Sequence, residues 1–114
     1  MSVDVEAIRA DLLRRRAELV AAGAGASESR AAVELDQTRV GRLSRMDALQ
    51  QQAMAQATEQ RRQAGIVRID AALARLVSGD YGFCTSCDEE IAPARLAFDP
   101  ATPVCIDCAG GEAR

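Results

Sequence analysis

The sequence predicts a mainly α-helical protein, in which a long antiparallel helical hairpin of the coiled-coil type is followed by a small four-cysteine module. Two long stretches, residues 3–22 and 45–77, carry apolar side chains at helical spacing. All four cysteines stand near the C-terminus as two C-x-x-C pairs with seventeen residues between them, which is the spacing of a four-thiolate zinc finger. We therefore expect the hairpin over residues 1–78 and the zinc-finger module over residues 79–114.

The first helical stretch has a narrow apolar stripe, whose members recur at intervals of three, four and seven residues. The stripe comprises Val5, Ile8, Leu12 and Leu19. The segment Gly23-Ala24-Gly25 that follows weakens a helix, because glycine is a poor helix former. If the helix continues through it, we expect a kink there.

The second stretch is longer, and Gly65 is its one weak point. Its main stripe comprises Ile66, Ile69, Leu73 and Leu76, and a slimmer stripe of Met46, Leu49, Ala53 and Ala57 extends it. A chain reversal at Gly23–Gly25 would leave the main stripe without a partner, whereas a reversal between Ala32 and Ser44 sets the two arms' main stripes against each other. We place the tip near residues 32–48 and expect a hairpin roughly 45–50 Å long.

Residues 79–114 differ in character from the arms. The stop signal Ser78-Gly79-Asp80 precedes them, they hold all three prolines, and no helical period is visible before Ala109. We expect a frayed tail after Ala109 and a small core, since few large apolar side chains are present. The candidates for that core are Tyr81, Phe83, Ile91, Leu96, Phe98, Val104 and Ile106.

The cysteine pairs are candidates for binding one structural zinc ion. The four ligands would be Cys84, Cys87, Cys105 and Cys108. Each pair is expected to form a turn, and the residue after it, Asp88 or Ala109, often needs a positive φ. The chain has no histidine, and four thiolates leave no open position for substrate, so the zinc would hold the fold together. A redox dithiol or two disulfides are the alternatives.

Charge argues against phosphate neutralisation as the main way of binding a partner. The formal net charge is -3, and residues 79–114 hold two arginines against seven acids. The triplet Arg14-Arg15-Arg16 stands beside Asp11 and Glu18, which indicates a solvated helix face. The N-terminus lacks the apolar run of a signal peptide, and no stretch reaches membrane-spanning length, so we expect a cytoplasmic protein.

The segment Gly79-Asp80-Tyr81-Gly82-Phe83-Cys84, the exit Cys105-Ile106-Asp107-Cys108 and the long helix before them resemble the DksA/TraR family of bacterial zinc-finger proteins. The close match covers about residues 66–109, while the hairpin matches in architecture. The resemblance implies a transcription regulator without enzyme activity that binds RNA polymerase. It also implies that the helical hairpin enters the secondary channel and that the zinc lobe stays near its entrance.

In that family the working residues are acids of a D-x-x-D-x-A motif at the tip. This sequence has Asp47-Ala48 in the tip region but no complete motif, and its charges there are mixed. The candidate partner-binding residues are Glu34, Asp36, Arg42, Arg45, Asp47 and Ala48. Helix capping for the two aspartates and ordinary solvation for the arginines are the alternative interpretations.

Three other functions stay open from the sequence. The module could bind nucleic acid directly, although its acidity speaks against direct DNA binding. Paired tip carboxylates such as Glu34 and Asp36 could position a metal ion in the polymerase and stimulate transcript cleavage. The chain could also be a plain helical adaptor. A hairpin that covers its own apolar stripes needs no partner helix, so we expect a monomer.

Overall fold

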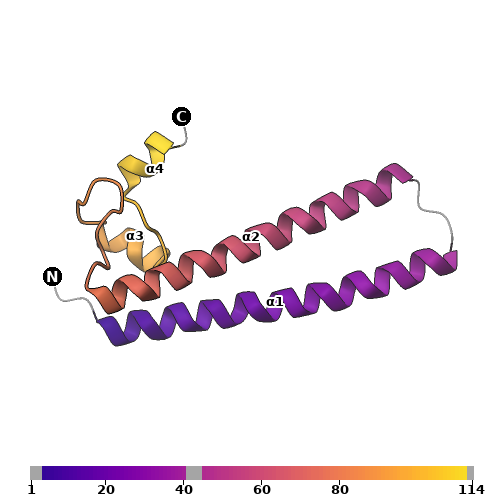
Figure 1. Cartoon of the computed structure of the whole chain (residues 1–114), viewed down its shortest axis with the longest axis horizontal. Helices are drawn as coiled ribbons and strands as arrows, with labels where there is room; N and C mark the ends of the chain where they lie inside the picture. The colour runs from indigo at the N-terminus through magenta and orange to yellow at the C-terminus, as the bar shows by residue number, and fades with distance from the viewer. Residues whose placement is uncertain (1–3, 41–44, 113–114) are drawn as a thin grey trace. The chain divides into compact units, whose positions relative to one another are not determined.

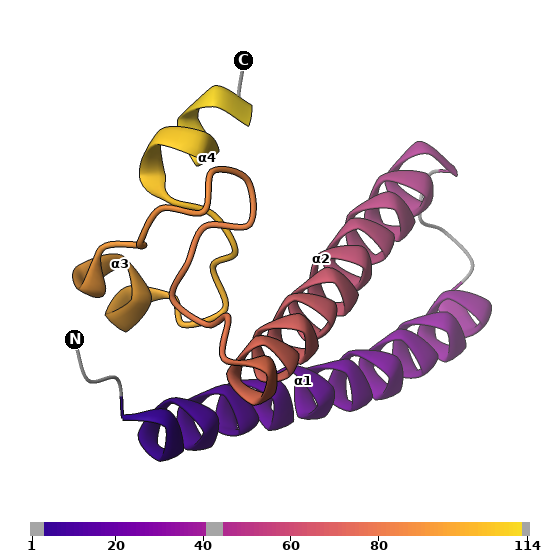
Figure 2. The ribbon, with the colours of Figure 1, turned by 60° about the vertical axis from the view of Figure 1, so that its left-hand side comes forward.

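A computed structural model describes residues 4–40 and 45–112, and the side chains of residues 4–25 and 45–110. It has four helices in this part of the chain: α1 (Val5–Val40), α2 (Arg45–Ser78), α3 (Pro93–Phe98) and α4 (Ile106–Glu112) (Figure 1 and Figure 2). The described residues form no β-sheet and hold one isolated bridge, between Phe83 and Glu90. The predicted fold class, a helical hairpin followed by a four-cysteine module, is confirmed. No helix in the described ranges is long and apolar enough to cross a membrane.

Helix α1 begins at a capped end and continues through the glycine segment. The carboxylate of Asp4 accepts a hydrogen bond from the N–H of Ala7 at 3.1 Å, which satisfies a donor that the first turn leaves free. The helix then runs to Val40 without the interruption that Gly23 and Gly25 could have caused. Each glycine costs a helix only about 1 kcal/mol relative to alanine, which packing against a second helix can offset.

The chain divides into two compact units. The first joins Met1–Arg16 to Val67–Arg114, and the second is Ala17–Ile66. Because each unit takes residues from both arms, the predicted division into residues 1–78 and 79–114 stays a prediction. The bounds of the two long helices leave residues 41–44 between them, and these residues, with the candidate Arg42, lie outside the described part of the chain.

In the first unit, the buried side chains of the arms come from the two predicted stripes. Leu12 is fully buried, and α2 contributes Ile69 and Leu76 from its stripe and Ala72 beside them. Val5, the outermost member of the first stripe, is 39% exposed. A hydrogen-bonded ion pair joins the arms, with Arg16 Nε 2.8 Å from Asp70 Oδ1. Antiparallel apolar packing therefore closes the base of the hairpin.

The second unit brings the arms together through glycine and arginine. The guanidinium of Arg62 donates to the backbone oxygen of Leu19 across the hairpin at 3.1 Å, and Glu59 accepts two further hydrogen bonds from it. A Cβ built on Gly65 would lie 3.0 Å from Leu19 Cδ1, so the missing side chain allows this close approach.

The slimmer stripe of α2 is mostly exposed. Met46 is 71% exposed and Leu49 is 59% exposed, and Ala53 is exposed as well. Its two larger members are followed only by alanines, so the stripe offers little apolar area to bury. The buried apolar side chains of α2 therefore come from its main stripe, which is the one nearer the module in the sequence.

The two glycines of α1 provide a matched test of the contact with Arg62. A Cβ on Gly23 would lie 2.6 Å from Arg62 Nε, whereas a Cβ on Gly25 would meet nothing within 4 Å. We expect Gly25→Ala to stabilise the helix by up to about 1 kcal/mol. Gly23→Ala should gain about 1 kcal/mol less, because Arg62 must leave the carbonyl of Leu19. Urea unfolding followed by helical circular dichroism measures both, and equal gains would contradict the packing described.

Candidate metal centre

The first cysteine pair lies in a tight turn closed by backbone hydrogen bonds. The N–H of Cys84 donates to the oxygen of Glu89 at 2.8 Å, and the N–H of Asp88 donates back to the oxygen of Cys84 at 2.9 Å. Asp88 has a φ of +65°, a conformation that aspartate tolerates better than most residues. The expectation of a positive φ after the first pair is met, and the turn carries Cys84 and Cys87 on one short loop.

The second pair is built differently from the first, which corrects the expectation of two similar turns. Cys105 directly precedes helix α4, Cys108 lies in its first turn, and the N–H of Ala109 donates to the oxygen of Cys105 at 3.0 Å. Residues three apart on a helix share a face, so helical backbone brings the two thiols together without a positive φ at Ala109. The expected frayed tail is also wrong as far as Glu112, where α4 ends.

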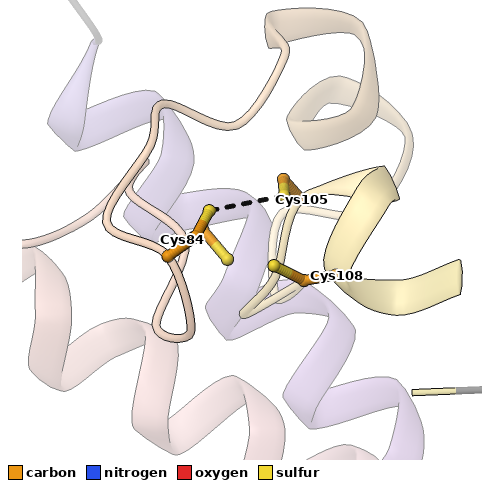
Figure 3. A group of neighbouring side chains, drawn as sticks. Cys84, Cys105 and Cys108 are labelled. Atoms are coloured by element: carbon orange, nitrogen blue, oxygen red, sulfur yellow. Dashed lines mark hydrogen bonds between the residues drawn. The ribbon is translucent and has the colours of Figure 1, made fainter. Parts of the chain in front are cut away.

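The four sulfur atoms converge on one point. They all lie within 4.8 Å of one another, and the side chains of Cys84, Cys105 and Cys108 point toward one another in Figure 3. The sulfurs of Cys87 and Cys105 are 3.7 Å apart. Four sulfurs around a zinc ion, with Zn–S bonds of about 2.3 Å, have tetrahedral edges of about 3.8 Å. A disulfide would need about 2.05 Å, and all four cysteines are free, so the geometry fits a metal and not two disulfides.

The environment of the thiols favours thiolates in the presence of a cation. Burial alone raises the pKa of the Cys84 thiol, but backbone N–H groups of Cys105, Cys87 and Ser86 lower this pKa to about 6. Hydrogen bonds to the neighbouring cysteines, Cys105 first and then Cys84 and Cys87, raise the pKa of Cys108, and burial and charge repulsion from Cys105 add to the effect. A divalent ion removes that repulsion, so the donor set fits zinc.

A small apolar core lies beside the cysteines. It consists of Cys84, Ile91 and Val104, with Leu96 and Ala109 packed against it. Two hydrogen bonds hold the segment before the second pair in place: the N–H of Thr85 donates to Pro103 at 2.9 Å, and Arg95 Nε donates to Val104 at 3.0 Å. A core of this size supports a stable fold only with an added cross-link such as a metal.

Several residues predicted for this core are exposed. Phe98 is 85% exposed, Ile106 is 71% exposed and Phe83 is 44% exposed. The two short helices explain the first two, because Leu96 occupies the core-facing side of α3 and Cys108 occupies that side of α4. No helical period is visible in the sequence before Ala109, and yet α3 and α4 form there. A helix of six or seven residues contains fewer than two full turns, which is too short to show a period.

Contacts that the sequence did not reveal join the module to α2 within the first compact unit. Arg68 of α2 forms an ion pair with Asp99, with Nη2 and Oδ2 2.9 Å apart. Within the module itself, the hydroxyl of Tyr81 donates to the backbone oxygen of Pro100 at 2.7 Å. Neither Arg68 nor Asp99 belongs to a motif, and no local pattern connects residues 31 positions apart.

The structure describes only part of the predicted tip set. Arg45, Asp47 and Ala48 lie in the first turn of α2, where Arg45 and Asp47 are exposed and Ala48 is half-buried. Glu34 and Asp36 belong to α1, but their side chains lie outside the described residues. The role of this set as a partner-binding tip therefore stays a prediction.

Removal of the metal should unfold the module before it affects the hairpin. We expect a chelator, or the substitution Cys84→Ser, to abolish amide protection over residues 79–112 while much of the helical signal persists, because the module's own core is small. Hydrogen exchange read by mass spectrometry measures this, and Ser86→Ala, an exposed position on the same loop, is the matched control. Full protection of the module without metal would overturn the assignment.

Comparison with known proteins points to one family. Residues 79–113 match the family model described as the prokaryotic dksA/traR C4-type zinc finger. The RNA polymerase-binding transcription factor DksA of Haemophilus influenzae is 44% identical over 41 residues, or 36% of this chain. The factor of the same name from Escherichia coli K12 is 40% identical over 43 residues, or 38% of this chain. These matches span 28% of the length of either relative.

A solved structure extends the similarity beyond the module. Transcription factor DksA2 from Pseudomonas aeruginosa aligns with a TM-score of 0.75 and 28% sequence identity, covering 96% of this chain and 82% of that one. The likeness thus includes the hairpin as well as the four-cysteine module. Together with the converging sulfurs, the comparisons identify residues 79–113 as a dksA/traR C4-type zinc finger whose four cysteines fit one zinc ion, and they show that the whole chain is similar to transcription factor DksA2.

Proposed function

We propose that the chain is a zinc-binding, non-enzymatic regulator of bacterial transcription that binds RNA polymerase in the cytoplasm. The observation that carries the proposal is the similarity to transcription factor DksA2, which extends over nearly the whole chain. The curated relatives that match the module are named for binding RNA polymerase. The chain spans about a quarter of the length of these relatives, so the proposal rests on the similarity to DksA2 and on the four-cysteine site.

The metal in this proposal is structural. Its ligands are the four cysteines of the module, Cys84, Cys87, Cys105 and Cys108. A tetrahedral shell of four thiolates has no open position at which a substrate or a water could be activated. The zinc therefore fixes the fold of the module and performs no chemistry, which supports a regulator that is not an enzyme.

The hairpin is the part that reaches into the polymerase in this proposal. Helices α1 and α2 contain 36 and 34 residues, so each is about 50 Å long at 1.5 Å per residue. A single helix with its side chains is about 10–12 Å wide, so a pair of helices suits a narrow channel. We propose that the tip of the hairpin enters the secondary channel of the enzyme while the zinc module stays at the entrance.

The residues proposed to act at the tip carry charges of both signs. They are Glu34, Asp36, Arg42, Arg45, Asp47 and Ala48. Without a complete D-x-x-D-x-A motif, the arginines are the more distinctive part of this set. We propose that Arg45, exposed at the start of α2, docks on acidic polymerase surface, while Asp47 lies in the same first helical turn.

Direct binding to nucleic acid loses support from the ion pairs of α1. Arg14 and Arg15 both hydrogen-bond to Asp11, and Arg16 pairs with Asp70 of α2. The three arginines therefore pair with neighbouring carboxylates and do not form a continuous positive surface for binding phosphates. Among the described residues, no contact favours stimulation of transcript cleavage over regulation.

The proposal predicts saturable binding to core RNA polymerase. Binding should be measured with the zinc-loaded full chain by fluorescence anisotropy, and a known secondary-channel factor should displace it. Duplex DNA in place of the polymerase is the control and should bind much more weakly, because the chain is acidic overall. Absence of binding to the polymerase, or binding that the competitor leaves unchanged, would contradict the proposed mode.

The same assay tests the tip with two exposed arginines of α2. Arg45 lies in the first turn, and Arg61 lies further along the helix, where it contacts Thr58. We expect Arg45→Ala to weaken binding by roughly two- to tenfold, as loss of one charged rim contact does, and Arg61→Ala to have little effect. Equal effects of the two substitutions would argue against a contact localised at the tip.

A further inference from the structure

Helix α3 (Pro93–Phe98) exposes a face without a single polar side chain. Ala94, Ala97 and Phe98 stand at positions i, i+3 and i+4, so they lie side by side on the helix surface, and all three are exposed. Phe98 is 85% exposed, which leaves nearly its whole ring in contact with water. Single exposed apolar residues are common, but a helix face made only of apolar side chains around an aromatic ring is typical of an interaction site.

The rest of α3 explains why this face is apolar. Arg95 is the only charged residue of the helix, and it is turned inward, where Nε donates to the backbone oxygen of Val104 at 3.0 Å. Leu96 packs on the small core beside the cysteines. The two side chains that hold the helix in place thus leave the outward positions to the alanines and Phe98.

The face is also held rigidly. Asp99, the residue after Phe98, donates its N–H to the oxygen of Arg95 at 2.9 Å. The carboxylate of Asp99 accepts hydrogen bonds from the side chain of Arg68 and from the N–H of Ala101. A helix end fixed by three such contacts loses little conformational entropy when a partner binds, which favours docking.

The charge of the module indicates the kind of partner that fits this face. Three consecutive acids, Asp88, Glu89 and Glu90, are exposed on the segment that leads to α3. The module carries two arginines against seven acids over residues 79–114, and one of those arginines is the inward Arg95. An apolar face on a module of net negative charge is complementary to an apolar patch flanked by basic side chains.

We propose that the outer face of α3, formed by Ala94, Ala97 and Phe98, is a docking surface for an apolar, basic-rimmed patch of RNA polymerase, with Phe98 as its anchor. The inference rests on the proposed function and adds a contact in the zinc module to the one proposed for the tip. The module then has two tasks, since the zinc fixes its fold and α3 holds it on the partner.

The test compares two exposed apolar residues of the same compact unit. Phe98→Ser removes the anchor, and Val77→Ser is the matched control, because Val77 is 82% exposed on α2 and lies outside α3. We expect Phe98→Ser to weaken binding to core polymerase about tenfold or more, as removal of an aromatic anchor does, and Val77→Ser to leave it unchanged. Both variants should keep the wild-type melting temperature and one zinc per chain, because neither side chain is buried.

The outcomes separate this inference from the proposed function. If the wild type binds the polymerase and Phe98→Ser binds equally well, the docking surface is overturned while the proposed function stands. If the wild type does not bind at all, both fail. Analytical ultracentrifugation of the free chain tests whether a second copy of the chain occupies this face instead. A wild-type dimer that Phe98→Ser converts to a monomer would assign the face to that second copy and overturn the proposal.

Discussion

The convergence of four cysteine sulfurs is the constraint on which the C-terminal module depends. The apolar cluster beside the cysteines has three buried members among the described residues, Cys84, Ile91 and Val104, and one of these is itself a candidate ligand. Such a core cannot offset the entropy of ordering more than thirty residues, so a metal cross-link must supply the difference. The module in turn is joined to α2 by the pair Arg68–Asp99, which connects the metal centre to the base of the hairpin.

Much of this architecture could be predicted, because the signals are local or periodic. The stripes that contain Leu12 and Ile69 repeat at helical intervals, and the two C-x-x-C pairs are motifs in their own right. The short helices α3 and α4 were missed, since they are too short to show a period, and both cysteine pairs look alike in sequence although one is a turn and the other a helix start. Exposure of Phe98 depends on which side of α3 Leu96 occupies, and the sequence does not reveal this.

The metal site and the surfaces proposed to contact the polymerase have different tasks. The four-cysteine site carries the match to the zinc-finger family, and in the proposed function a closed shell of four thiolates would hold the fold and perform no chemistry. The proposed contacts with the polymerase lie on two other surfaces: charged residues such as Arg45 at the start of α2, and the apolar face of α3 around Phe98. Two such contacts on one partner would add their effects without either being strong, because binding at one raises the local concentration at the other.

The most direct test of this account is a structure of the zinc-loaded chain bound to core RNA polymerase, determined by electron cryomicroscopy. The account predicts density for the helical hairpin inside the secondary channel, with the four-cysteine module at the channel entrance. A complex in which the hairpin lies outside the channel, or in which the chain contacts only nucleic acid, would contradict it.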